Sequence, residues 1–234
     1  MKIGMRAHDI DCTDMESLCS RLAKLDIHTI QLALLKSIGN IPLADGCFSF
    51  GLAGEIQRPL QQHRIRVSVL GCYIDPICAD GAQRRVQLNR FQEHMKFAKY
   101  LGAGMIGTET GCVKPGEEAA AYAILLESMK ELVSAAEKLG VMIGVEPVRG
   151  HTLSSPQKMA DFLKDVPSPN LSVILDLNNL LDEHNFRRQR EVIDESFALF
   201  GDRIAAIHIK DFKVESGKKI PALPGEGIMD IPYL

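Results

Sequence analysis

Three apolar segments in the second half of the chain each carry, near their carboxyl end, a side chain that can bind a metal ion. The segments are residues 141–147, 173–176 and 205–211, and the side chains are Glu146, Asp176 and His208. Successive members lie roughly 30 residues apart, about the length of one strand plus one helix. If the strands are neighbours in a parallel sheet, two carboxylates and one imidazole gather at one end of that sheet.

The same alternation of strand and helix extends along the whole chain. Helices end in Tyr100-Leu-Gly102 and Lys138-Leu-Gly140 just before apolar strands, as expected for glycine caps. Strands are expected at residues 2–8, 29–34, 66–73, 105–109, 141–147, 173–176 and 205–211. Helices are expected after a capping box at Thr13–Glu16, at 54–63, 83–100 and 117–139, after Ser154-Ser155-Pro156, and at 188–200.

Alternating strands and helices of this size predict a parallel sheet with helices outside it. The chain has 234 residues, of which 46% are hydrophobic, so it suits one large core. We therefore expect an α/β fold with a single domain over residues 1–234, a (β/α)8 TIM barrel. No eighth strand is recognisable before Leu234, so we expect the C-terminal part of the barrel to be missing. An open doubly wound sheet is the alternative.

Composition and charge restrict the function classes. The formal net charge is −3 and the sequence pI is about 6.2, so no broad basic field favours nucleic acid as a partner. No apolar run approaches the ~18 residues that span a bilayer, so no membrane location is expected. The six cysteines include no Cys-x-x-Cys pair, and the chain begins with a strand-like segment rather than a signal peptide. These features predict a cytoplasmic protein.

Two carboxylates with one imidazole form a ligand set typical of divalent metal ions. Alternate residues of a barrel strand point inward, which would aim Glu146, Asp176 and His208 into the mouth of the barrel. Such oxygen-rich ligation suits Mn²⁺, Mg²⁺ or Co²⁺, with Zn²⁺ as a further candidate. Structural ion pairing among the three residues is the alternative.

Four short motifs resemble those of one enzyme family. Gly144-Val-Glu-Pro147, Ile174-Leu-Asp176, His208-Ile-Lys-Asp211 and Pro224-Gly-Glu-Gly227 are similar, in order and spacing, to the sugar phosphate isomerase/epimerase family of xylose isomerase-like TIM barrels. The resemblance covers essentially the whole chain. It implies metal ligation by Glu146, Asp176 and His208 together with a glutamate on the eighth strand, which has no counterpart here. Metal binding by the printed chain is therefore expected to be weak.

One further departure from the family pattern concerns the residue three positions after the metal aspartate. Family members often have histidine there, whereas this chain has Asn179. Asparagine can still donate a hydrogen bond to a sugar hydroxyl, but it cannot transfer a proton. The related apurinic-site endonucleases use several histidines for a zinc cluster, and the few histidines and the lack of a basic surface here argue against that function.

Other polar residues are candidates for substrate binding at the same rim. Lys210 would point into the mouth, where it could act in catalysis with Glu146 by stabilising an enediolate oxygen. The candidate substrate ligands are Glu109, Arg149, His151, Asn179 and His8. For Glu109 the alternative is an ion pair with Arg6, Arg149 could simply be solvated, and His8 could equally be a core histidine.

Two loops leave alternatives open. The segment 36–50 could be a lid over the substrate, or it could pack on neighbouring loops or on a second subunit of a homo-oligomer. Pro224–Gly227 could offer backbone amides to an anion, although a simple turn is favoured.

The sequence thus predicts a metal-dependent isomerase or epimerase of a sugar or sugar phosphate. The resemblance implies proton transfer through an enediolate, with Glu146 as the base. A dehydratase of a cyclic polyol could use the same residues. A barrel that binds a sugar without catalysis is the alternative from another class.

Overall fold

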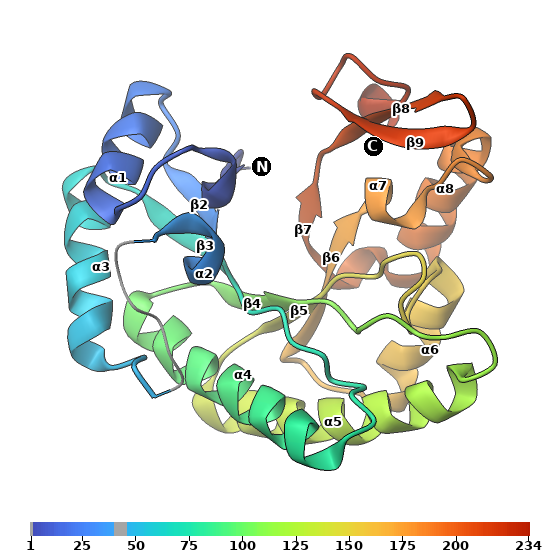
Figure 1. Cartoon of the computed structure of the whole chain (residues 1–234), viewed down its shortest axis with the longest axis horizontal. Helices are drawn as coiled ribbons and strands as arrows, with labels where there is room; N and C mark the ends of the chain where they lie inside the picture. The colour runs from blue at the N-terminus through green and yellow to red at the C-terminus, as the bar shows by residue number, and fades with distance from the viewer. Residues whose placement is uncertain (1, 40–45) are drawn as a thin grey trace. The chain divides into compact units, whose positions relative to one another are not determined.

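The computed structural model describes residues 2–39 and 46–234, which contain one parallel sheet of seven strands in chain order (Figure 1). Each strand lies beside its predecessor, with helices in the connections, which is the arrangement of a TIM barrel. In a doubly wound sheet the strand order reverses at one point. The observed order therefore confirms the barrel prediction and excludes the open doubly wound alternative.

The strands of this sheet are β1 (Met5–Arg6), β2 (Thr29–Leu32), β3 (Arg66–Gly71), β4 (Met105–Thr108), β5 (Ile143–Val145), β6 (Leu171–Asp176) and β7 (Ile204–His208). The α-helices are α1 (Met15–Lys24), α2 (Leu34–Ser37), α3 (Phe50–Gln62), α4 (Gly81–Leu101), α5 (Glu118–Leu139), α6 (Pro156–Asp165), α7 (Leu177–Leu180) and α8 (Gln189–Phe200). A separate antiparallel hairpin consists of β8 (Asp211–Glu215) and β9 (Lys218–Ala222).

These elements are divided between two compact units. The first comprises residues 1–74, 85–108 and 132–143. In it β2 pairs with β3 in parallel, and the Ser68 hydroxyl donates to the carbonyl of Ile30 at 3.0 Å. Helices α1 and α3 lie beside these strands (Figure 1). The apolar side chains of Ile30, Leu32 and Leu70 are fully buried and form part of its core.

The second unit comprises residues 75–84, 109–131 and 144–234, and it holds the predicted ligands. All six residues of β6 are buried, and β6 pairs in parallel with β7. Near the carboxyl end of β6, a small apolar cluster joins α7, α8 and the hairpin; its buried members are Leu177, Leu181, Ile193 and Phe212. This cluster fixes α7 and the hairpin beside the strand ends.

Most predicted elements are confirmed, with shifts at their ends that have local causes. The N-cap of α1 is Asp14 rather than Thr13, because Asp14 Oδ1 accepts the N–H of Ser17 at 2.8 Å. Ser155 caps α6 with Pro156 at its first turn, as predicted. The last predicted strand is too long at its carboxyl end, since β7 stops at His208 and Asp211 already begins β8.

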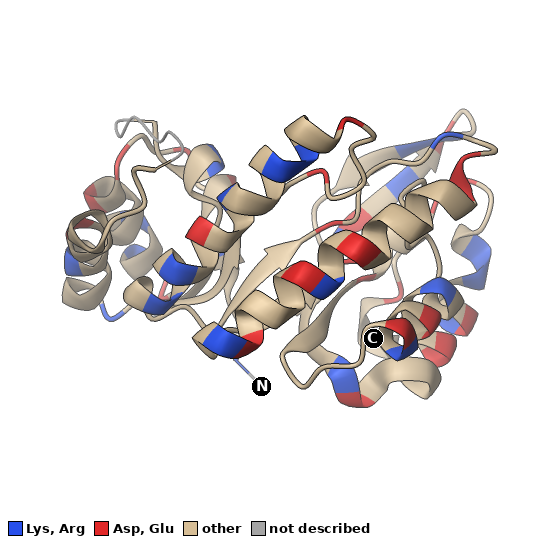
Figure 2. Cartoon of the chain, turned by 90° about the horizontal axis from the view of Figure 1, so that it is seen from below, with Lys and Arg blue, Asp and Glu red and all other residues tan. Residues whose placement is uncertain are grey.

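Charged residues of both signs are interspersed along the helices (Figure 2). Among the described residues, no helix is both long enough and apolar enough to cross a bilayer.

Candidate functional site

The structure brings Glu146, Asp176 and His208 together in the second unit. Asp176 is the last residue of β6 and His208 the last of β7, and the two are partners in the register of this strand pair. Glu146 directly follows β5. Each residue offers one ligand atom, and these three atoms lie within 4.8 Å of one another. The three side chains whose spacing suggested neighbouring strand ends therefore do lie close together.

Opposite charges balance within this cluster. His208 Nδ1 lies 3.5 Å from Glu146 Oε2 and 3.5 Å from Asp176 Oδ2. The ammonium of Lys210 forms an ion pair with the same Oδ2 of Asp176. The side chains of Asp176 and Glu146 are 0% and 4% exposed, so water screens these charges poorly.

The protonation states follow from this environment. Burial lowers the pKa of His208, but the neighbouring Asp176 and Glu146 carboxylates outweigh it and raise the pKa to about 9. Burial raises the pKa of Asp176, but His208 and Lys210 outweigh it, so the pKa is lowered overall. Without a metal ion, the cluster at neutral pH therefore contains an imidazolium.

The short helix α7 adds hydrogen bonds to both carboxylates. Asp176 is its N-cap, and Asp176 Oδ1 accepts the backbone N–H of Asn179 at 3.2 Å. The side-chain amide of Asn179 donates to Glu146 Oε1 at 2.5 Å. One oxygen of each carboxylate is thus fixed by Asn179, while the other faces His208.

This donor set fits a divalent metal ion. Glu146, Asp176 and His208 would supply two carboxylate oxygens and one imidazole nitrogen, the ligands preferred by Mn²⁺, Mg²⁺ and Co²⁺ and also accepted by Zn²⁺. Binding would require His208 to lose the proton that its raised pKa retains. The amide of Asn179 acts on the ligand Glu146, as groups beside metal ligands commonly do.

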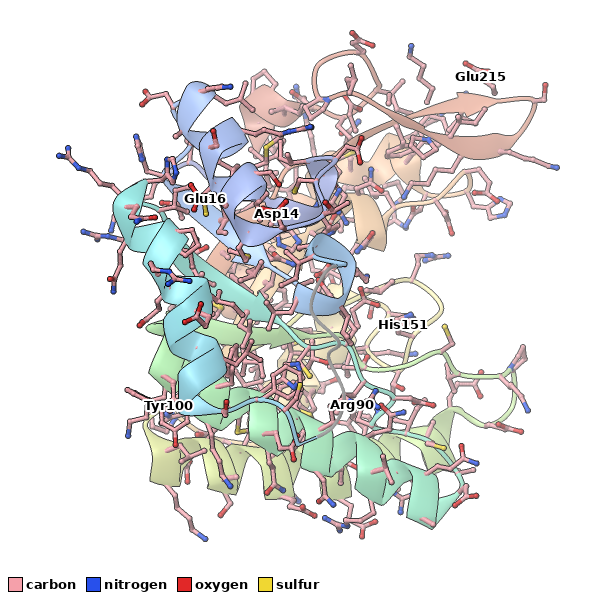
Figure 3. All side chains as sticks on the ribbon, turned by 60° about the vertical axis from the view of Figure 1, so that its left-hand side comes forward. Asp14, Glu16, Arg90, Tyr100, His151 and Glu215 are labelled. Atoms are coloured by element: carbon pink, nitrogen blue, oxygen red, sulfur yellow. The ribbon has the colours of Figure 1, made fainter. Side chains whose placement is uncertain are left out.

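Two further candidates lie in the loop after β5, on which Figure 3 labels His151. Arg149 Nε forms an ion pair with Asp182 Oδ2 at 2.7 Å, and its side chain is 46% exposed. His151 Nδ1 lies 3.8 Å from Glu109 Oε2. Burial lowers the pKa of His151 more than the charges of Glu146 and Asp75 raise it, so this imidazole is neutral at pH 7.

The other predicted contacts have different outcomes. Arg6 forms an ion pair with Asp9 at 2.9 Å. The expected alternative for Glu109, an ion pair with Arg6, stays a prediction. His8 lies in a short 3-10 turn (Ala7–Asp9) of the first unit, and its role as a substrate ligand stays a prediction.

The two loops also differ in outcome. Residues 40–45 of the predicted lid lie outside the described part of the chain, so its role as a lid or subunit contact stays a prediction. The amides of Gly225 and Gly227 donate to Asp211 Oδ2 at 3.0 and 2.9 Å. They serve a turn within the protein, which favours that interpretation over an anion site.

Sequence reasoning missed three residues near the site: Asp182, Asp211 and Lys219. Asp182 Oδ1 accepts the N–H groups of His184 and Asn185 at 2.9 and 3.0 Å, a local turn that its sequence Asp-x-x-Asn favours. The hairpin with Lys219 also had a sequence signal, because the pair Ser216-Gly217 is typical of a turn between two strands. In the structure both residues have positive φ, 50° and 74°, as a two-residue hairpin turn requires.

Comparison with solved structures shows the same fold in several proteins. A D-tagatose 3-epimerase-like protein has a TM-score of 0.78 at 15% identity, covering 100% of this chain and 84% of that one. 3-Keto-D-glucoside 4-epimerase from E. coli has a TM-score of 0.75 at 12% identity, covering 99% of this chain and 84% of that one. A xylose isomerase-like TIM barrel protein from Mycobacterium smegmatis, in complex with magnesium, has a TM-score of 0.72 at 15% identity, covering 98% of this chain and 83% of that one.

Sequence comparison identifies the family. The chain matches no curated protein sequence. A family model described as xylose isomerase-like TIM barrel matches residues 16–234, nearly the whole chain. With this match, the strand order and the shared fold, the chain belongs to the xylose isomerase-like TIM barrel family.

Proposed function

We propose that the protein is a divalent-metal-dependent epimerase or isomerase of a sugar or sugar phosphate. One observation carries this proposal: Glu146, Asp176 and His208 place their ligand atoms within 4.8 Å of one another beside the ends of three successive parallel strands. The fold shared with sugar epimerases supports a small sugar as the substrate class.

The chemistry needs a base beside an acidic C–H bond, and we assign this role to Glu146. Its carboxylate is almost fully buried, and the Asn179 amide fixes one of its oxygens at 2.5 Å. A fixed, poorly solvated carboxylate is well placed to remove the proton next to a substrate carbonyl. When bound, a divalent ion would act as a Lewis acid that polarises the carbonyl and its neighbouring hydroxyl.

Lys210 is assigned to the negative charge that develops on the substrate oxygen. Its ammonium lies against Asp176, and its side chain is 25% exposed, so it is reachable from the solvent side. A small movement would let it contact an enediolate oxygen, where positive charge stabilises the transition state. His151 and Glu109, which lie together, are assigned to substrate hydroxyls. Arg149, in the same loop as His151, is a further candidate for this role.

Isotope exchange tests the reaction. The full chain is loaded with Mn²⁺, Mg²⁺ or Co²⁺ and incubated in D₂O with a panel of ketoses and ketose phosphates. Proton transfer predicts deuterium at the reacting carbon, and Glu146→Gln should lower turnover by at least ~100-fold. Glu195→Gln, an exposed change on α8, is the matched control and should not alter turnover.

Other outcomes separate the alternatives. Turnover without exchange of that hydrogen favours direct hydride transfer and removes the base role from Glu146. Loss of water from a cyclic polyol identifies a dehydratase. Sugar binding without turnover by any metal-loaded form identifies a non-catalytic barrel.

A further inference from the structure

A hairpin after β7 folds into a fixed shape beside the metal-ligand cluster. Strands β8 and β9 pair from Asp211↔Ala222 to Glu215↔Lys218, and Figure 3 labels Glu215 at the outer tip. At the base, the buried carboxylate of Asp211 accepts N–H groups from Phe212, Gly225, Gly227 and Met229 at 2.8 to 3.0 Å. The segment that follows β9 is thereby tied back to the start of β8.

Lys219 extends from this hairpin to the helix α7, above which the hairpin lies in Figure 1. Its ammonium donates to the carbonyl of Leu181 at 2.8 Å and also to the carbonyl of Asn178. The same ammonium lies 4.5 Å from the centroid of the Phe212 ring. Carbonyls at a helix C-terminus lack partners within the helix and favour positive charge. Lys219 therefore binds α7 at its carboxyl end.

The opposite end of α7 touches the cluster. Asp176 caps this helix, and Asn179 donates its backbone N–H to Asp176 and its side-chain amide to Glu146. A helix of only four residues is not stable alone, so its position depends on its neighbours. Those neighbours include the apolar cluster around Phe212 and the ammonium of Lys219. The backbone N–H of Arg149 and the side-chain amide of Asn185 also donate to carbonyls of α7, those of Asn179 at 2.8 Å and Leu180 at 3.0 Å.

We propose that Lys219 is a positioning residue for the Glu146–Asp176–His208 cluster. By binding the carbonyl of Asn178 in α7 and that of the C-cap Leu181, its ammonium holds Asn179 where that residue fixes one oxygen of each carboxylate. Burial lowers the pKa of Lys219, as expected for an ammonium withdrawn from water towards these carbonyls. The consequence for metal binding rests on the proposed function, whereas the placement of α7 does not.

The test compares variants on one strand. Lys219→Met keeps the alkyl chain beside Phe212 but removes the donors, and Lys219→Arg keeps a cation. Lys218→Met is the matched control, because Lys218 is the exposed neighbour on β9. Two quantities are measured: hydrogen exchange of the Asn179 backbone amide, and Mn²⁺ affinity from water-proton relaxation. Amides of the buried strand β6 report whether each variant is folded.

Lys219→Met should speed exchange at Asn179 at least ~10-fold, with β6 still protected. It should also weaken Mn²⁺ binding by about 10- to 100-fold, the scale seen for groups that orient metal ligands. Lys219→Arg should retain most of the protection of the Asn179 amide and most of the Mn²⁺ affinity. Lys218→Met should change neither quantity.

Two results would overturn the proposal. One is faster exchange confined to the hairpin while Asn179 stays protected, and the other is unchanged Mn²⁺ affinity despite faster exchange at Asn179. If the wild-type chain binds no Mn²⁺, the metal part of the proposed function fails, and exchange at Asn179 alone decides whether Lys219 holds α7.

Discussion

The side-chain amide of Asn179 donates a hydrogen bond to Glu146 Oε1 at 2.5 Å, so an uncharged donor holds the residue to which we assign the base role. This contact gives a direct experiment. Asn179→Asp would place a second carboxylate against the almost fully buried Glu146, and two carboxylates in contact there cannot both ionise without cost.

We expect Asn179→Asp to lower the free energy of unfolding at about pH 8 by ~1–3 kcal/mol. The loss should shrink towards pH 5, because protonation of one carboxyl group relieves the repulsion. Asn179→Ala removes the donor without adding charge, so its smaller loss should change less with pH. Urea unfolding of the three proteins at several pH values measures this. Equal losses at every pH would mean that the two side chains do not touch.

His208 predicts a second pH dependence, in protein freed of metal by chelation. Its pKa is raised from 6.5 to about 9 in the folded protein, so the folded state holds the proton more tightly than the unfolded state. The stability that it contributes is complete below pH 6.5 and is lost as the pH rises through about 9. The difference between the folded and unfolded pKa of His208 corresponds to a loss of about 3 kcal/mol in the free energy of unfolding.

Unfolding by urea at about pH 6 and pH 9.5 measures this loss. The wild-type protein should lose stability over the interval, and His208→Gln should lose much less of it. A wild-type stability that stays level over this range would show that the imidazolium does not pair with Glu146 and Asp176.

The strand ends were predictable from the sequence because their spacing and apolar pattern are local signals. Asp176 and His208 end adjacent parallel strands, and the register makes them direct partners. The start of α6 was equally readable, since Ser155 and Pro156 favour an N-terminus through their own backbone chemistry.

Contacts made across the chain were not predictable in this way. Lys219 reaches carbonyls about 40 residues away, and Asp211 binds amides 14 to 18 residues ahead. Only the folded hairpin creates these distances, and a single lysine or aspartate gives no periodic signal. The N-cap of α1 could not be assigned to one residue from the sequence, because Thr13 and Asp14 are both favourable N-cap residues. In the structure Asp14 is the cap.

Asp211 supplies a third prediction. Its carboxylate accepts four backbone N–H groups, and an asparagine would turn one acceptor oxygen into a donor facing amides. Asp211→Asn should therefore lower the free energy of unfolding near neutral pH by ~1–3 kcal/mol. Glu226→Gln, an exposed change in the same loop, is the control.

The stability that Asp211 contributes should decrease in acid. Burial raises the pKa of Asp211, but the four amides outweigh it, so the pKa is lowered below 3.8. The stability contributed by Asp211 is then present above pH 3.8 and is lost as the pH falls through the lower folded value. The gap between wild type and Asp211→Asn should narrow in acid, and a constant gap would contradict the assignment.

Two glycines of the first unit predict opposite effects of the same substitution. A Cβ on Gly104 would lie 2.9 Å from the carbonyl oxygen of Ser68, a backbone atom that cannot move aside cheaply. Gly104→Ala should therefore destabilise the protein by ~1–3 kcal/mol, the cost of overpacking.

Gly54 lies exposed in α3, and a Cβ there would meet nothing within 4 Å. Gly54→Ala should stabilise the protein by ~0.5–1 kcal/mol, because alanine loses less conformational entropy in a helix. Thermal and urea unfolding of both variants measure the two signs, and a stabilising Gly104→Ala would mean that the chain before β4 does not approach β3 so closely.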